Sequence, residues 1–238
     1  MRVAVMQPYF FPYVGYWQLI NAVDMFVIYD DVNYINRGWI NRNRILINGE
    51  AHMITLSLQQ SSQNKQINNI LVGSNKGKIL KTISNVYKKA PYFTEVYLLV
   101  EQLMNDNEQR LCKFLGNTIQ YLAKYLEIST KIVYSSDLAY DRQKKGQDKI
   151  IEIAEYLQAS TYVNLIGGEA LYENIAFQRR EIKLEFLESN NFNYKQFSNY
   201  FVPWLSIIDV MMFKNRSEIK FYLDKGYSLM ESRICKKL

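Results

Sequence analysis

Polar side chains that could hold a substrate follow directly on the first apolar run of the sequence. Gln7 and Tyr9 come after residues 3–6, and Pro8 and Pro12 restrict the backbone around them. In an open α/β sheet the carboxyl ends of the strands line the ligand crevice, so an amide and a phenol here are well placed to bind a ligand. A purely structural turn is the alternative interpretation.

Two carboxylates, Asp30 and Asp31, end the apolar run 25–29, a pattern typical of a buried strand that meets a polar site. They could serve as a general base or ligate Mg²⁺. Successive strand residues point to opposite faces, so Asp31 could instead cap a turn. His52 is the only histidine, and any imidazole base has to be this residue, although a lone histidine is more often structural. Asp30 and His52 are therefore the candidate catalytic residues.

The segment 37–44, Arg-Gly-Trp-Ile-Asn-Arg-Asn-Arg, is the most informative stretch by residue type. Arginine can grip a phosphate with two hydrogen bonds, and asparagine offers fixed donors and acceptors to sugar hydroxyls. Its tryptophan could stack on a base or sugar, or anchor the loop in the core. A solvated edge strand would also look basic. The candidate substrate-binding residues are Gln7, Tyr9, Asp31, Trp39, Asn41, Arg42, Asn43 and Arg44.

Two later segments carry weaker signals. Gly167 and Gly168 follow an expected strand at 161–164, and a glycine turn there can let the backbone approach a ligand closely. Ser206 and Asp209 are spaced by one helical turn, but no histidine is near in sequence to activate the serine. We therefore interpret them as a helix cap and a core helix residue.

The elements that would position these residues follow an α/β pattern. A strand at 2–6, a helix at 16–23 and a strand at 25–29 form a βαβ unit, which implies parallel pairing with a right-handed crossover. Helical periodicity runs from 76 to 126, with a break before Pro91. Further strands are expected at 53–58, 131–134, 161–164 and 182–186. We expect one α/β domain over 1–238, with a central, largely parallel or mixed sheet flanked by helices and a helical insertion around 76–126.

Composition excludes several classes of protein. The net charge of +6 would attract anions, but the basic residues are dispersed, which favours a small phosphate-bearing ligand over a polynucleotide. Cys112 and Cys235 are far apart and have no metal-ligand spacing, so we expect neither a disulfide framework nor a bound metal. No apolar stretch is long enough for an integral membrane segment, and no basic region precedes an apolar one at the N-terminus. We expect a cytoplasmic protein.

The ordered set of these segments resembles the WbqC-like protein family. The resemblance is carried by Gln-Pro-Tyr-Phe-Phe-Pro-Tyr-Val-Gly-Tyr at 7–16, Asp-Met-Phe-Val-Ile-Tyr-Asp-Asp-Val at 24–32, Trp-Ile-Asn-Arg-Asn-Arg at 39–44 and Pro-Trp-Leu-Ser-Ile-Ile-Asp at 203–209. It implies a role with bacterial surface polysaccharides, particularly O-antigen assembly of lipopolysaccharide, in which activated amino sugars are modified. It assigns no catalytic residue.

The leading hypothesis is an enzyme that transfers an acyl or aminoacyl group to the amine of a nucleotide-linked sugar. Arg42 and Arg44 would bind the diphosphate, and the neighbouring asparagines would orient sugar hydroxyls with Gln7. A ring, from Tyr9 or Trp39, would stack on the ligand. The catalytic candidates named above would accept the proton of the attacking amine, which has no lone pair while protonated. The acyl donor stays undetermined.

Two other classes remain open. A glycosyltransferase-like enzyme could use Asp30 or Asp31 with a divalent metal. A non-catalytic protein could bind RNA or a protein partner through its basic surface. If the acyl donor were an aminoacyl-tRNA, the transferase hypothesis and the RNA-binding hypothesis would both apply.

Overall fold

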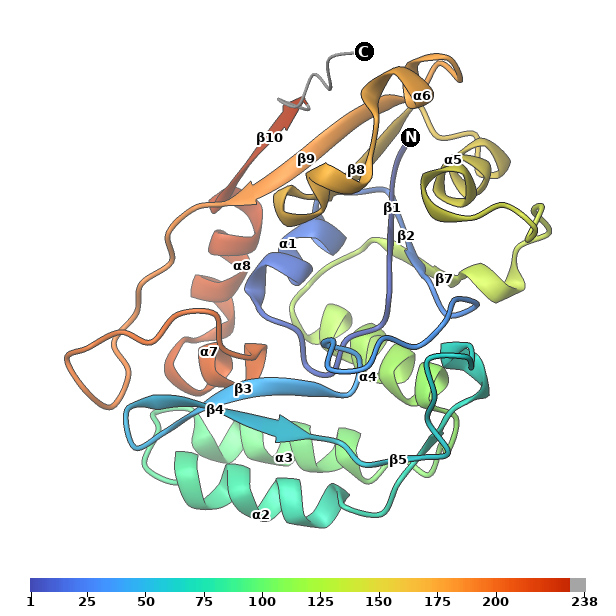
Figure 1. The fold of residues 1–238 in the computed structure, drawn as a ribbon. Coiled ribbons are helices and arrows are strands. Elements are labelled where there is room, and N and C mark those ends of the chain that lie inside the picture. The colour runs from blue at the N-terminus through green and yellow to red at the C-terminus, as the bar shows by residue number, and fades with distance from the viewer. Residues whose placement is uncertain (232–238) are drawn as a thin grey trace.

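The computed structural model describes residues 1–231 and centres on a six-stranded sheet (Figure 1). The strand order is β10-β9-β8-β1-β2-β7, and neighbours are parallel except β9 and β10, which are antiparallel. The strands are β1 (Arg2–Met6), β2 (Met25–Ile28), β7 (Lys131–Tyr134), β8 (Thr161–Leu165), β9 (Lys183–Ser189) and β10 (Tyr227–Glu231). The predicted mixed sheet is confirmed.

The chain winds in two directions from β1. Helix α1 (Val14–Asn21) leads to β2 on one side, whereas α5 (Gly146–Tyr156) returns the chain to β8 on the other side of β1. Strands β1 and β8 pair only near their amino ends, at Arg2 with Thr161 and Val3 with Tyr162. Because both strands continue beyond these pairs, they separate towards their carboxyl ends. The fold therefore has a topological switch point there, where open α/β sheets bind their ligands.

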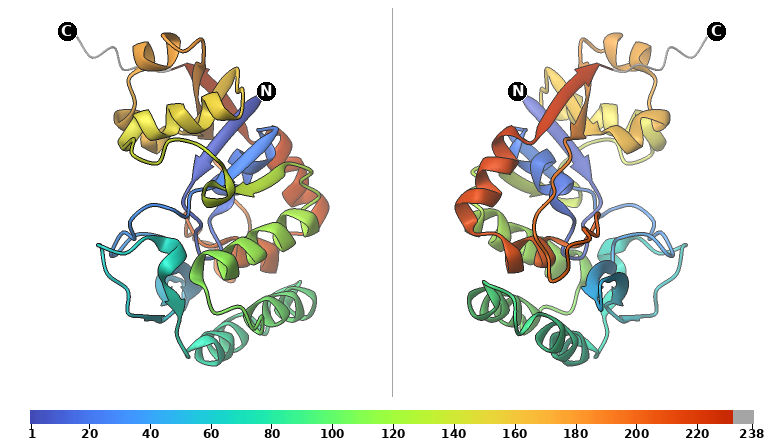
Figure 2. Two further views of the ribbon diagram at one scale, coloured as in Figure 1. Left: turned by 90° about the vertical axis from the view of Figure 1, so that its right-hand side faces the viewer. Right: turned by 90° about the vertical axis from the view of Figure 1, so that its left-hand side faces the viewer.

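Helices cover both faces of the sheet (Figure 2). On one face α5 and α6 (Asn174–Gln178) pack their apolar side chains against β-strand residues such as Val5, Val27 and Phe186. On the other face the core contains α1, α4 (Leu111–Tyr125), α7 (Ile207–Phe213) and α8 (Arg216–Lys225) with the opposite sides of the same strands. The inner strands β1, β2 and β8 are thus largely buried on both faces, and the near-continuous apolar runs of β1 and β2 indicate this burial.

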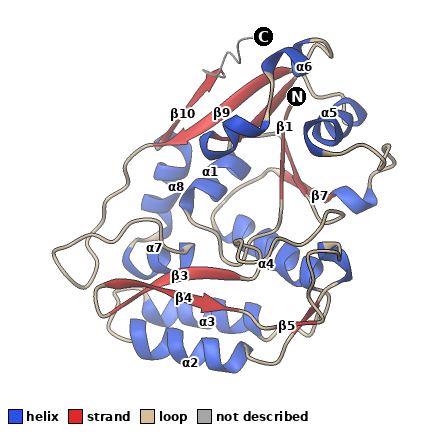
Figure 3. Cartoon of the chain, viewed as in Figure 1, coloured by secondary structure: helices blue, strands red, loops and turns tan. Residues whose placement is uncertain are grey.

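A second layer lies below the sheet in the view of Figure 3. It contains the antiparallel hairpin of β3 (Arg42–Ile47) and β4 (Glu50–Thr55), with α2 (Lys76–Tyr87) and α3 (Phe93–Met104) beneath it. The short strands β5 (Leu58–Gln59) and β6 (Leu71–Val72) flank the 3₁₀ turn η1 (Ile67–Asn69). Two further 3₁₀ turns are η2 (Ser135–Asp137) and η3 (Ile166–Leu171).

The hairpin departs from the sequence-based expectation. Only the end of the Asn/Arg stretch, residues 42–44, belongs to a strand, β3, and the strand expected at 53–58 lies at 50–55 as its partner outside the main sheet. Asn48 and Gly49, with φ of 51° and 82°, form the tight turn between them. An Asn-Gly pair between two apolar runs is a strong hairpin signal, because both turn positions need positive φ.

No helix in the described part of the chain is long and apolar enough to cross a membrane. Cys112 is buried and free, whereas Cys235 lies outside the residues that the structure describes.

Candidate functional site

The loop after β1 is held in shape by two residues from distant parts of the chain. The Asn43 side-chain amide donates hydrogen bonds to the carbonyl oxygens of Phe10 (3.1 Å) and Phe11 (2.8 Å). The Ser206 hydroxyl donates to the Phe11 carbonyl at 2.7 Å, and the Ser206 backbone N–H donates to the Arg44 carbonyl at 2.8 Å. The loop, β3 and the segment before α7 are therefore locked together as one frame.

This frame and the separating ends of β1 and β8 enclose a cavity of about 960 Å³. Its walls include several aromatic residues, which are Tyr9, Tyr13, Tyr29, Trp39, Tyr172 and Trp204. Aromatic rings offer a ligand apolar area for stacking together with polar tips. Its position at the switch point is the expected position for a ligand in this class of fold.

Neutral polar side chains form part of the cavity wall. The Asn164 amide donates to the hydroxyls of Tyr172 (2.8 Å) and Tyr162 (3.2 Å), which lie 3.1 Å apart. Burial raises the pKa of the Tyr172 phenol, and burial followed by the Tyr172 charge raises the pKa of Tyr9. Both phenols are therefore protonated at neutral pH and can donate hydrogen bonds to a ligand.

Glycines and the start of a helix form another part of the cavity wall. Gly146 and Gln147, at the start of α5, line the cavity together with Gly167 and Gly168 of η3. A Cβ on Gly167 would meet nothing within 4 Å, so the backbone there is open to a ligand. This agrees with the close backbone approach expected from the sequence.

The lining of the main cavity carries one charged side chain, Glu188 of β9, and no lysine or arginine. A cationic side chain, that of Arg44, lines an adjoining side pocket of about 240 Å³ instead, together with Trp39 and Trp204. The main cavity is therefore suited to the neutral part of a ligand rather than to a diphosphate.

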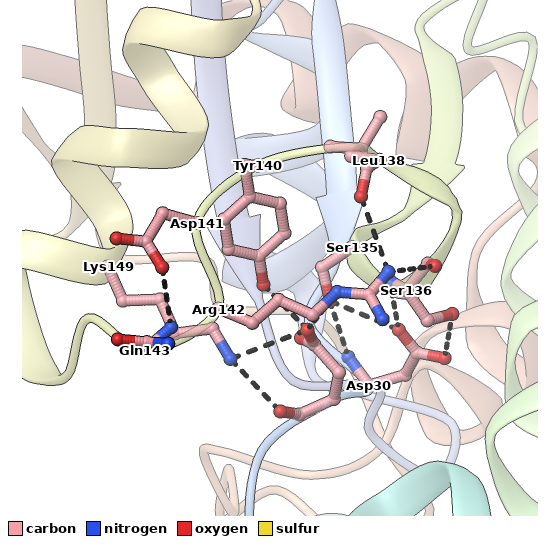
Figure 4. Close-up of polar contacts among 10 residues, drawn as sticks. Asp30, Ser135, Ser136, Leu138, Tyr140, Asp141, Arg142, Gln143 and Lys149 are labelled. Carbon is pink, nitrogen blue, oxygen red and sulfur yellow. Dashed lines mark hydrogen bonds and ion pairs between the residues drawn. The ribbon is translucent and has the colours of Figure 1, made fainter.

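The two aspartates that follow β2 are buried in a hydrogen-bond network outside the cavity lining, and Figure 4 shows the part of this network around Asp30. Asp30 is fully buried and accepts hydrogen bonds from Ser135 (3.1 Å) and from the backbone and hydroxyl of Ser136 at 3.0 and 2.8 Å. Asp31 accepts from the hydroxyls of Ser135 and Tyr140, both at 2.6 Å. These contacts fasten the β7–α5 connection to the end of β2.

A buried cation completes this network. The Lys149 ammonium, on α5, lies 3.4 Å from the Asp31 carboxylate and donates to the Asp31 carbonyl at 3.0 Å. Burial would raise the pKa of Asp31, but hydrogen bonds from Ser135 and Tyr140 and the Lys149 charge outweigh it and lower that pKa. The network thus holds an ionised carboxylate and fixes the start of α5 beside the cavity.

The structure separates the predicted site residues into two groups. Gln7, Tyr9 and Trp39 line the cavity, and Arg44 borders the side pocket. Asn43 also borders the side pocket, but its amide holds the loop after β1. The remaining predicted residues lie outside the linings of both pockets; they are Asp30, Asp31, Asn41, Arg42 and His52.

The side chains of the second group have other contacts. Asn41 accepts from the Tyr34 hydroxyl at 2.7 Å and donates to the Leu56 carbonyl at 2.8 Å. Arg42 donates to the carbonyls of Gly38 and Arg37, so its guanidinium closes its own loop. His52 is about half exposed on β4, 3.8 Å from Glu50. The expected single cavity of N-terminal loop, acidic strand end and Asn/Arg segment is therefore formed only in part.

Several lining residues were not among the predicted site residues. Tyr29 directly precedes the aspartate pair, and Asn164 ends a strand that the sequence predicted, so the position of each at a strand end was a usable signal. Trp204 stands in the late Pro-Trp-Leu-Ser motif, where Ser206 was expected to cap a helix and does cap α7. Glu188 had no distinguishing sequence pattern.

No group of three or more histidine, cysteine, aspartate or glutamate side chains within residues 1–231 could hold a metal ion. In the described chain, the carboxylates of the aspartate pair are already engaged by hydroxyls and Lys149.

Comparisons with known proteins agree with the ordered motifs. The chain is 27% identical over 227 residues to the uncharacterized protein Rv1507c of Mycobacterium tuberculosis, an alignment that covers 93% of this chain and 97% of that protein. No solved structure matches the chain. The sequence model of the WbqC-like protein family matches residues 7–221, which include the cavity loop, the aspartate pair, β3 and the segment before α7. The chain therefore belongs to the WbqC-like protein family.

Proposed function

We propose that this chain is a transferase that moves an acyl or aminoacyl group to the amine of a nucleotide-linked amino sugar, in the assembly of bacterial surface polysaccharide such as O-antigen. The observation that carries the proposal is the cavity of about 960 Å³ at the switch point, with its aromatic and neutral polar walls. Ligand cavities typically measure roughly 300–1,000 Å³, so this one has room for a two-part ligand.

The neutral polar part of the cavity wall suits a sugar. Gln7, Asn164 and Tyr172 offer neutral donors and acceptors, which match hydroxyl groups without requiring a charge on the ligand. Tyr9 and Tyr29 supply ring faces for the apolar side of a sugar ring. Because no lysine or arginine belongs to this lining, we place the sugar ring in the cavity and the diphosphate of the nucleotide-linked sugar outside it.

The reaction needs a proton acceptor near the bound amine. The amine nitrogen forms a C–N bond to the acyl carbon, and the bond from that carbon to the sulfur of a thioester or the oxygen of an aminoacyl ester breaks. Glu188 is the carboxylate of the cavity lining, so it takes the amine proton and passes it to the leaving sulfur or oxygen. It replaces Asp30, which is fully buried, and His52, which lies outside the cavity.

Binding and turnover are tested separately. Purified protein is screened by thermal shift with nucleotide-linked sugars, with and without a free amine on the sugar. It is then incubated with the amino sugars that bind and with acyl thioesters or aminoacyl-tRNA, and the sugar product is analysed for a mass gain. A stabilising shift and an acyl mass gain on the amine support the proposal. A protein that no nucleotide-linked sugar stabilises, or that modifies none of them, contradicts it.

A matched pair of variants connects binding to the cavity. Gln7→Ala removes an amide from the cavity wall, whereas Gln178→Ala removes an exposed amide from α6, outside the cavity lining. We expect the first variant to weaken sugar binding by about tenfold, the value of one or two lost hydrogen bonds, and the second to leave it unchanged.

A further inference from the structure

The side pocket next to the main cavity has walls that differ in charge from those of the cavity. It measures about 240 Å³ and shares four lining residues with the cavity, which are Tyr9, Tyr13, Trp39 and Trp204. Pro12, Asn43 and Arg44 complete its lining. Arg44 is the only charged residue of this set, so the side pocket adds a cation beside a cavity that has none.

Contacts with both tryptophans position the Arg44 side chain. Its guanidinium carbon lies 5.4 Å from the centre of the Trp39 ring, and one terminal nitrogen donates to the Trp204 carbonyl at 3.2 Å. Trp204 has a φ of 59°, a backbone conformation rarely adopted by a large side chain, and its ring lies 5.7 Å from that of Tyr13. The arginine is therefore held in place before any ligand arrives.

The guanidinium nevertheless retains unused donors. Its Nε atom is buried and has no hydrogen-bond partner, and Arg44 forms no ion pair with any residue between 1 and 231. A buried N–H of a charged group without an acceptor is costly, and native structures rarely leave one unexplained. An oxyanion in the side pocket would complete the hydrogen bonding of the guanidinium, because the planar fork of N–H donors of arginine matches two oxygens of a phosphate or carboxylate.

We propose that the side pocket is an oxyanion subsite, in which Arg44 grips a phosphate or carboxylate of a ligand whose neutral part occupies the main cavity. Identifying this group as the diphosphate of a nucleotide-linked sugar rests on the proposed function, whereas the subsite itself does not. Trp39 and Trp204 form the walls that both pockets share, so a ligand that spans the pockets passes between their rings.

The same two tryptophans report on the subsite. Trp39 and Trp204 are 39% and 61% exposed, whereas the third, Trp17, is fully buried in the core. Intrinsic fluorescence is therefore titrated with inorganic pyrophosphate and, separately, with acetate, at constant ionic strength. The proteins compared are the wild type, Arg44→Gln, Arg44→Lys and Arg37→Gln. Arg37 is exposed, lies outside both pockets, and provides the control for the loss of one positive charge.

We expect a saturable fluorescence change in the wild type and in Arg37→Gln, and at least about a tenfold loss of affinity in Arg44→Gln. Arg44→Lys keeps the charge but lacks the fork, so its affinity should lie between these values. Tighter binding of pyrophosphate than of acetate identifies a phosphate site, and the reverse order a carboxylate site. Circular dichroism verifies that each variant is folded. If Arg44→Gln is not folded, the affinity of Arg44→Lys alone tests the subsite.

Two results would overturn the subsite. The first is a wild type that shows no saturable response to either anion, and the second is an Arg44 variant that is folded and binds both anions like the wild type. Anion binding without any acyl transfer would contradict only the proposed function. Acyl transfer whose KM is unchanged in the folded Arg44 variants would contradict only the subsite.

Discussion

The Asn43 side-chain amide donates a 2.8 Å hydrogen bond to the carbonyl oxygen of Phe11, a residue with a φ of 43°. Asn43 also accepts, from the backbone N–H of Arg44, at 2.8 Å. Its polar atoms are therefore used within the protein, although its residue type had suggested a sugar ligand. The asparagine shapes the loop that presents Gln7 and Tyr9 to the cavity.

Replacing Asn43 should therefore affect stability first and ligand binding second. Asn43→Ala leaves the carbonyls of Phe10 and Phe11 with fewer donors in a buried environment, and we expect a loss of about 1–3 kcal/mol in the free energy of unfolding. Urea denaturation measures this loss. Asn107→Ala, at an exposed loop position, is the control and should change stability by less than about 0.5 kcal/mol. Equal stability of both variants would contradict the role of the Asn43 amide in holding the loop after β1.

The sequence predicted the scaffold better than the site, for a physical reason. Apolar runs such as 25–28 can be recognised as strands locally, because burial on both faces of a sheet requires a continuous run. The role of a polar residue depends on which backbone groups lie opposite it after folding. Asn43 and Asp30 carried typical ligand-binding chemistry, yet their partners are a carbonyl 32 positions away and a serine hydroxyl 105 positions away.

The same limit explains the residues that sequence reasoning missed. Glu188 and Asn164 belong to the site only because β8 lies beside β1 and β9 beside β8, with their carboxyl ends at the same edge of the sheet. Strand order is a long-range property, and no local pattern around Glu188 distinguishes it from other surface glutamates. By contrast, the Asn48–Gly49 turn was a local signal that could have predicted the hairpin.

Two buried aspartates should affect stability with opposite dependence on pH. Asp31 has a lowered pKa in the fold, since hydrogen bonds and Lys149 outweigh the effect of burial. Its ionised form stabilises the protein above its unfolded pKa of about 3.9, and this stabilisation is lost as the pH falls through the lower folded value. Asp31→Asn should therefore be less stable than the wild type at pH 7, and the deficit should shrink below about pH 4.

Asp209 should show the opposite trend. Burial raises its pKa, although hydrogen bonds from Tyr194 (2.6 Å), Tyr87 (2.7 Å) and Gln196 (2.9 Å) lower it in part. The folded state holds the Asp209 proton more tightly than the unfolded state, so this group lowers stability as the pH rises through the interval between the two pKa values. Asp209→Asn removes that charge, and its stability relative to the wild type should rise from about pH 4 to pH 7.

Urea denaturation of the wild type and both aspartate variants, at several values from well below pH 4 up to pH 7, tests the two trends together. The difference in unfolding free energy from the wild type should move in opposite directions with pH for the two variants. Parallel curves would show that one of the two environments is assigned incorrectly.

Replacing each of two helix glycines by alanine should change the stability of the protein in different ways. A Cβ on Gly116, in α4, would overlap the hydroxyl and ring of Tyr134 at the end of β7, whereas a Cβ on Gly77, in α2, would meet nothing within 4 Å. Gly116→Ala should cost about 1–3 kcal/mol through overpacking. Gly77→Ala should be neutral or stabilise by up to about 1 kcal/mol, because alanine favours the helix.

Thermal and urea unfolding measure both glycine variants. A double variant that combines Gly116→Ala with Tyr134→Phe should recover part of the loss, because the phenol oxygen is among the atoms that a new methyl would meet. No recovery would mean that the cost arises from the ring or from elsewhere in α4.

The carboxylate of Glu188 should matter for turnover rather than for folding, if it accepts the amine proton in the proposed reaction. Glu188→Gln keeps the size and shape of the side chain but replaces one carboxylate oxygen with an amide nitrogen, which removes its basicity. We therefore expect kcat to fall by about 100-fold or more with little change in KM, as for the loss of a general base. Glu181→Gln is the matched control, because Glu181 is exposed just before the amino end of β9, whereas Glu188 lies near the carboxyl end that faces the cavity. Steady-state rates of acyl transfer measure both variants, and a Glu188→Gln enzyme with the kcat of the wild type would exclude this carboxylate as the proton acceptor while leaving the cavity as the binding site.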